Sequence, residues 1–151
     1  MSDAPANTRF LVPLRWSDMD AYGHVNNVQF LRLLEDARVI GFREWFGQDR
    51  TLLDTGVIVS RHEIEYLAPL TFHYTPIAVD MWVTRVGGAG FEVAYAVRDP
   101  DDAGDTVYAR AETSLAAYSF EDARPRRLSP TEREQLGRYL GEAVPMRWRR
   151  R

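Results

Sequence analysis

The segment from Asp18 to Asn27 gathers side chains that could carry out a reaction. Within these ten residues it holds two carboxylates, a phenol, an imidazole and two amides. Turns and helix caps commonly use one Asp or Asn, but neither needs six such groups together. A long amphipathic stretch follows, so a helix would begin at Asn26 or Asn27. We therefore expect a reactive cluster at the N-terminus of a helix.

The chemistry that this cluster favours is acyl transfer by a carboxylate. Unpaired backbone N–H groups at a helix start, together with the helix dipole, stabilise a carbonyl oxygen that gains negative charge. The amides of Asn27 and Val28 are the candidates for that site. Asp20, a few residues upstream, could attack the carbonyl or deprotonate a water that does. The sequence contains no cysteine, so thiol nucleophiles and thiolate metal sites are excluded.

A metal site is not expected. The three histidines, His24, His62 and His73, form no pair at metal-ligand spacing. The run that starts at Asp18 superficially resembles a calcium loop, but its last ligand position is Gln29, which cannot act as the bidentate carboxylate.

A long helix must lie directly after the cluster. Apolar residues recur every three or four positions from Phe30 to Trp45, which predicts a helix with a wide apolar face. Asn26 is its expected N-cap, with Gln29 completing a capping-box-like pair, and Gly47 its expected end.

A period of two indicates strands around this helix. The expected strands are 9–16, 57–66, 77–86, 91–98 and 106–118, and a short helix should open at Ser129 and run to about Leu140. Pro13 restricts the first strand to an edge or a bulge. Glycine-rich residues 87–90 join two strands, so they predict a hairpin and not a dinucleotide-binding loop, which leads into a helix. The order predicts an α+β domain, with an antiparallel sheet of about five strands and one long helix on its face.

Length and composition limit the number of domains, the class of partner and the expected location. The 151 residues suit one domain, 1–151, with a flexible tail at about 143–151. A net charge of -3 argues against nucleic acid as a partner. No apolar run long enough for a membrane span and no secretory signal is present, so we expect no membrane association and a cytoplasmic location.

The motif identifies a family resemblance. The stretch RWSDMDAYGHVNNVQF from Arg15 to Phe30, with Glu35 and Arg38 on the helix, resembles the hotdog-fold acyl-CoA thioesterases of the 4-hydroxybenzoyl-CoA thioesterase-like family. His24 to Asn27 also resemble the plant acyl-ACP thioesterases, and YLAPL at 66–70 falls where the fold expects it. The resemblance implies a hotdog fold, a sheet wrapped around a central helix. It also implies hydrolysis of acyl-CoA or acyl-ACP thioesters without a cofactor other than the CoA of the substrate, in a homodimer or homotetramer.

The same resemblance assigns roles to residues. It implies that Asp20 is the catalytic carboxylate, as general base or nucleophile, that His24 polarises or positions the substrate, and that the amide near Asn27 forms the oxyanion site. The expected substrate-binding residues are Tyr22, Gly23, Val28, Ser60, Arg61 and Arg85, with Ser60 and Arg61 coming from a partner subunit.

Two positions depart from the family pattern. Tyr22 stands where the plant enzymes have asparagine, so an Asp-Asn-His network is not complete here. Gly88, Ala89 and Gly90 replace basic residues that hold CoA phosphates in some members, which leaves Arg61, Arg85 or the segment 124–127 for that role.

Two alternative functions remain open at the level of sequence. One is a hotdog dehydratase acting on 3-hydroxyacyl thioesters, although the Asn26–Asn27 pair argues against it. The other is an acyl-CoA-binding module without catalysis. The acyl group itself is not specified by the sequence.

Overall fold

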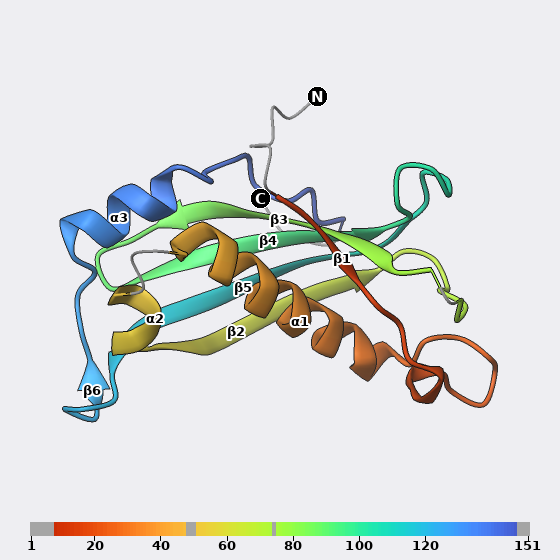
Figure 1. Ribbon diagram of the computed structural model, residues 1–151, viewed down its shortest axis with the longest axis horizontal. Helices are drawn as coiled ribbons and strands as arrows, with labels where there is room; N and C mark the ends of the chain where they lie inside the picture. The colour runs from red at the N-terminus through yellow and green to blue at the C-terminus, as the bar shows by residue number, and fades with distance from the viewer. Residues whose placement is uncertain (1–7, 48–50, 74, 148–151) are drawn as a thin grey trace.

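The computed structural model describes residues 8–47, 51–73 and 75–147 (Figure 1). In chain order the elements are β1 (Arg9–Val12), the 3-10 turn η1 (Trp16–Asp18), α1 (Asn27–Phe46), α2 (Thr51–Thr55), β2 (Val57–Tyr66), β3 (Ile77–Val86), β4 (Gly90–Arg98), β5 (Val107–Ser119), β6 (Arg124–Pro125) and α3 (Pro130–Gly137).

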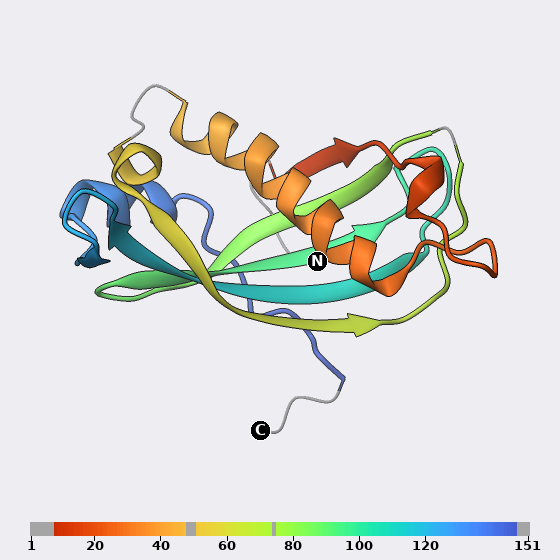
Figure 2. The same ribbon diagram turned by 90° about the horizontal axis from the view of Figure 1, so that it is seen from below.

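The strands form a single curled antiparallel sheet. Their order is β1-β3-β4-β5-β2, with the short β6 paired to β5. Helix α1 lies along one face of this sheet, as Figures 1 and 2 show from two directions. The predicted α+β architecture, a sheet of about five strands around one long helix, is confirmed.

The apolar face of α1 packs against the inward side chains of the sheet. Leu33, Leu34 and Ala37 are fully buried there. A Cβ on Gly41 would collide with the Met81 methyl group and contact the Phe10 ring. The absence of a side chain at Gly41 therefore lets α1 lie close to β1 and β3.

The strand predictions for β2 to β5 hold to within one residue at each end. The first strand is shorter than predicted, because it ends at Val12, immediately before Pro13, and it is an edge strand as expected. Helix α3 ends at Gly137, before the predicted Leu140. Neither α2 nor β6 was predicted.

The predicted cap of α1 is confirmed at Asn26, and Gly47 caps the other end. The capping-box prediction for Gln29 is wrong. The Asn26 N–H donates to the Asp18 carbonyl at 2.8 Å, and Gln29 Oε1 accepts from Arg32 Nε at 3.3 Å. The N-cap amide is already satisfied by the preceding loop, so it has no need of the Gln29 side chain.

The chain beyond α3 crosses the face of the sheet opposite α1, as Figure 2 shows. Gly141 N–H donates to the Val83 carbonyl at 2.7 Å, and Trp82 Nε1 donates to the Glu142 carbonyl at 2.7 Å. Val144 is buried against this face. Thus residues 143–147, the first part of the tail expected to be flexible, lie against the sheet. The remainder, 148–151, is outside the described residues.

Candidate active site

The polar segment before α1 forms a tight loop whose two arms are held side by side. Met19 and Val25 form an antiparallel bridge, and Asp20 N–H donates to the His24 carbonyl at 2.7 Å. At the tip, Gly23 has a φ of +76°, a left-handed conformation that favours glycine. The loop therefore brings Asp20 and His24 together at its base.

Asp18 has a structural role in this loop. The residue is only 1% exposed, and its Oδ2 accepts hydrogen bonds from Arg15 N–H at 2.7 Å and from Arg32 Nη2 at 2.5 Å. The Arg15 bond ties the loop to itself, and the Arg32 bond ties the loop to α1. Asp18 thus holds the turn, as a buried carboxylate with a charged partner can.

Asp20 is oriented through one oxygen and leaves the other available. Its Oδ1 accepts hydrogen bonds from Tyr22 N–H at 2.8 Å and from His24 N–H at 3.2 Å. No described residue donates a hydrogen bond to its Oδ2. The side chain is half-buried. A carboxylate held in this way can present its second oxygen to a ligand as a base or a nucleophile.

The first turn of α1 offers one unused amide beside this carboxylate. The Asn26 side chain accepts from Val28 N–H at 3.1 Å, and the Asn26 carbonyl accepts from Gln29 N–H at 2.9 Å. Among the described residues the Asn27 N–H has no acceptor. Of the two amides proposed from the sequence, Val28 is therefore engaged in the cap, and Asn27 is the one that can donate to an oxyanion.

These groups line a common hollow of about 380 Å³. Its lining comprises Asp20, His24, Val25, Asn27, Phe30 and residues 66–70. The structure thus brings together the three residues predicted to be catalytic, Asp20, His24 and Asn27.

Tyr66, at the end of β2, closes one side of the hollow. Its hydroxyl donates to the Asn27 carbonyl at 2.9 Å, and its ring meets Phe30 edge to face with centroids 5.3 Å apart. Burial raises the pKa of the Tyr66 hydroxyl, which keeps it a hydrogen-bond donor. Tyr66 was not predicted as a site residue, although YLAPL belonged to the family pattern.

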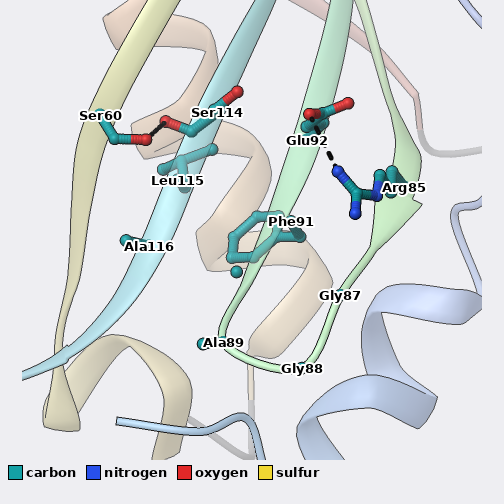
Figure 3. A pocket seen from close by; sticks show the side chains of 11 residues that line it. Ser60, Arg85, Gly87, Gly88, Ala89, Phe91, Glu92, Ser114, Leu115 and Ala116 are labelled. Carbon is teal, nitrogen blue, oxygen red and sulfur yellow. Dashed lines mark hydrogen bonds and ion pairs between the residues drawn. The ribbon is translucent and has the colours of Figure 1, made fainter. Parts of the chain in front are cut away.

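The other expected substrate-binding residues lie elsewhere in the subunit. Tyr22 is 85% exposed, and neither Tyr22 nor Gly23 lines the hollow. Ser60 and Arg85 line a different hollow of about 310 Å³, beside the 87–90 hairpin (Figure 3). Arg61 is paired with Glu112 at 2.5 Å and Glu63 at 2.9 Å.

Figure 3 shows that the residues lining the hairpin hollow come from the hairpin and from strands β2, β5, β4 and β3 beside it. Ser60 Oγ donates to the Ser114 carbonyl at 3.2 Å. Arg85 is mostly exposed and lies 3.8 Å from Glu92. The Arg127 guanidinium lies beside Gly88, where a Cβ would be 2.9 Å from its Nη2. Two arginines therefore flank a hairpin that itself has no basic residue.

Within the part of the chain that the structure describes, no group of three or more His, Asp or Glu side chains could hold a metal ion. In the same part, no helix combines the length and the apolar character needed to cross a membrane.

Comparisons with known proteins place these observations in a family. The model of the thioesterase-like superfamily matches residues 14–138. No curated protein matches the sequence. A predicted thioesterase from Bacillus stearothermophilus has the same fold, with a TM-score of 0.77 at 18% identity over 90% of this chain and 98% of that one.

Two further solved structures are more similar in sequence. A thioesterase from Thermus thermophilus, in complex with coenzyme A and Zn, has 26% identity and a TM-score of 0.72 over 88% of this chain and 94% of that one. A protein from Xanthomonas campestris, named as a candidate acyl-CoA thioesterase, has 25% identity and a TM-score of 0.64 over 80% of this chain and 97% of that one.

Proposed function

The chain belongs to the thioesterase-like superfamily, and on that basis we propose that it hydrolyses acyl-CoA thioesters to a carboxylic acid and free CoA. The observation that carries this proposal is the pairing of two groups in one hollow, an Asp20 carboxylate oxygen that has no donor among the described residues and an Asn27 amide that has no acceptor among them. Acyl carrier protein thioesters contain the same carbon–sulfur bond and are the alternative substrate. The relative in complex with coenzyme A favours CoA.

In this proposal the bond-breaking steps use water and the groups in this hollow. The thioester carbonyl oxygen accepts a hydrogen bond from Asn27 N–H, which stabilises the negative charge that develops on it. As a general base, Asp20 Oδ2 removes a proton from water while the water oxygen bonds to the carbonyl carbon. The carbon–sulfur bond then breaks, and the CoA thiolate leaves and takes up a proton. No cofactor is needed apart from the CoA of the substrate.

Asp20 can also act as the nucleophile. In that case Oδ2 bonds to the carbonyl carbon, CoA leaves, and water hydrolyses the resulting anhydride. The His24 ring lines the same hollow and can position the thioester in either route. A single turnover in heavy-oxygen water separates the routes, because hydrolysis of the anhydride at the Asp20 carbonyl labels the protein, whereas a general base leaves the label in the released acid.

The working unit in this proposal is a pair of subunits joined through β2. On its outer side β2 has no partner strand among the described residues, and an unpaired strand edge readily pairs with a second copy. Antiparallel pairing about a two-fold axis would bring the Ser60 end of one β2 to the Tyr66 end of the other. The hairpin hollow of one copy would then adjoin the Asp20 hollow of its partner.

This arrangement gives a role to the basic residues at the hairpin. Arg85 and Arg127 flank it, and guanidinium groups are well suited to phosphate. We assign the CoA phosphates to these arginines of the partner subunit, with Ser60 near the thiol arm. Arg61 is already held by Glu63 and Glu112, so its contribution would be to the shape of the site.

The direct test is thiol release from a panel of aliphatic and aromatic acyl-CoAs, together with one acyl carrier protein thioester. The proposal expects hydrolysis of at least one acyl-CoA. An increase in enoyl thioester absorbance with 3-hydroxyacyl-CoA would instead indicate a dehydratase. Binding of acyl-CoA without release of thiol from any member of the panel would indicate a binding module.

A further inference from the structure

A separate hollow of about 540 Å³ lies between α1 and strand β2 and shares no lining residue with the Asp20 hollow. Most of its wall is apolar. The apolar lining residues are Val39, Phe42, Leu53, Val57, Val59 and Leu115. Three charged residues of α1, Glu35, Arg38 and Arg43, complete it.

Arg38 is the unusual member of this lining. It is only 8% exposed, and its one hydrogen bond among the described residues runs from Nη1 to the Tyr95 hydroxyl at 3.0 Å. Within the same part of the chain no carboxylate lies within ion-pair distance of it. Arginine stays charged in proteins and is seldom buried without a paired anion. The hollow therefore contains a buried cation whose counter-ion the described residues do not supply.

Arg38 forms the polar floor of the hollow, and the polar groups packed behind Arg38 do not themselves line the hollow. Tyr95 is fully buried, and the His62 ring, from β2, lies 2.9 Å from the Thr113 hydroxyl through Nδ1. Glu35 is the one acidic residue in the lining, and it is exposed one helical turn before Arg38. The floor thus offers positive charge at Arg38, while the walls offer apolar surface.

We propose that this hollow binds an apolar chain that ends in a carboxylate, with the carboxylate on the Arg38 guanidinium and the chain against Val39, Phe42 and Val59. A charge-assisted pair with guanidinium is the strongest interaction that such a floor can make. Two molecules have this chemistry. One is a free fatty acid, and the other is an acyl thioester whose far end is a second carboxylate.

The binding test does not depend on catalysis. Calorimetry should detect binding of dodecanoate to the full chain and much weaker binding of dodecanol, which has the same chain without the carboxylate. Arg38→Gln should weaken dodecanoate binding by about ten- to a hundred-fold, the range expected for loss of a hydrogen bond to a charged group. The same substitution should change the affinity for dodecanol little.

The matched control is Arg43→Gln, because Arg43 lines the same hollow but is exposed. It should leave dodecanoate binding nearly unchanged. Equal binding of dodecanoate and dodecanol, or an equal loss in the two arginine variants, would overturn the inference. If Arg38→Gln does not fold, Val39→Trp fills the hollow from an exposed position and should abolish binding of dodecanoate. Unchanged binding there would overturn the inference as well.

A second pair of measurements identifies the source of the carboxylate, and this arm rests on the proposed function. We compare kcat/KM for dodecanedioyl-CoA and dodecanoyl-CoA in the native chain and in Arg38→Gln. If the far end of the substrate is bound, the variant lowers the ratio of the two values by about ten-fold or more. If the free acid is bound, the ratio is unchanged and inhibition by added dodecanoate is lost. Binding of dodecanoate by a chain that hydrolyses no acyl-CoA would overturn only the proposed function.

Discussion

Asp18 and Asp20 are separated by one residue, yet their surroundings differ sharply. Asp18 is buried and accepts from two different parts of the chain, whereas Asp20 is half-buried and keeps one oxygen without a donor among the described residues. A buried, fully paired carboxylate contributes to stability, whereas a carboxylate with an oxygen available beside a hollow can act as a base or a nucleophile.

Replacing Asp18 should affect stability. In Asp18→Asn the neutral amide weakens the buried pair with Arg32, and we expect a loss of about 1.5–3 kcal/mol in the free energy of unfolding. Urea unfolding measures this change. Asp36→Asn is the matched control, because Asp36 pairs with the same Arg32 from a side chain that is 39% exposed. An exposed pair contributes less, about 1 kcal/mol at most. Equal losses in the two variants would contradict the structural role of Asp18.

At the scale of elements, the start of α1 determines which amide can act. The Asn26 side chain takes the Val28 N–H and leaves that of Asn27 available. The site therefore depends on the cap and not only on the side chains in the hollow.

Removing this cap should lower both stability and activity. Asn26→Ala should cost about 1 kcal/mol in the free energy of unfolding, the usual effect of losing an N-cap. It should also lower kcat for thioester hydrolysis, because the first turn of α1 is no longer fixed. Ser129→Ala removes the cap of α3, far along the chain from the hollow. We expect a similar loss of stability there with kcat retained, and an equal loss of kcat in both variants would argue against a specific role for the α1 cap.

The elements that were predictable from sequence have strong local signals. Strands β2 to β5 are rich in β-branched and aromatic residues and lie between Gly, Pro and Asp turns, and α1 combines a wide apolar face with an Asn cap. The first strand was predicted too long because the apolar alternation continues through Pro13, although the pairing stops there. Helix α2 and strand β6 are too short to give a periodic pattern.

The candidate site was predictable only where it is contiguous in sequence. Asp20, His24 and Asn27 share one loop and helix start, so their proximity follows from the chain itself. Tyr66 reaches the hollow only because β2 ends beside the start of α1. The Arg38 hollow likewise depends on the packing of α1 against β2, which the periodicity of α1 does not specify.

At the scale of the whole molecule, the faces and edges of the sheet differ in how they are covered. Helix α1 covers one face, and residues 141–147 cross the other. At one edge lies β2, the longest edge strand that the structure describes, which pairs with β5 on its inner side and carries exposed apolar residues such as Ile58. This edge is where we expect a second copy to bind.

A charge on this edge should separate the subunits. For Ile58→Lys, sedimentation should give a mass near 17.4 kDa, whereas the native chain should give at least twice that value. The rate of thioester hydrolysis should fall in the same variant, because a monomer lacks the hairpin arginines of the partner. Leu11→Lys is the control, since Leu11 is exposed on β1 at the opposite edge. A native chain that sediments as a monomer would contradict the shared site.

The turnover of Asp20→Asn directly measures what the Asp20 carboxylate contributes to hydrolysis. The amide can still accept from the N–H groups of Tyr22 and His24, so the loop should keep its shape and the unfolding midpoint should stay close to that of the native chain. We predict that kcat for acyl-CoA hydrolysis falls by about 10²–10⁴-fold, the usual contribution of a general base. Turnover near the native rate in a folded Asp20→Asn would contradict the assignment of Asp20 as the group that activates water or attacks the thioester.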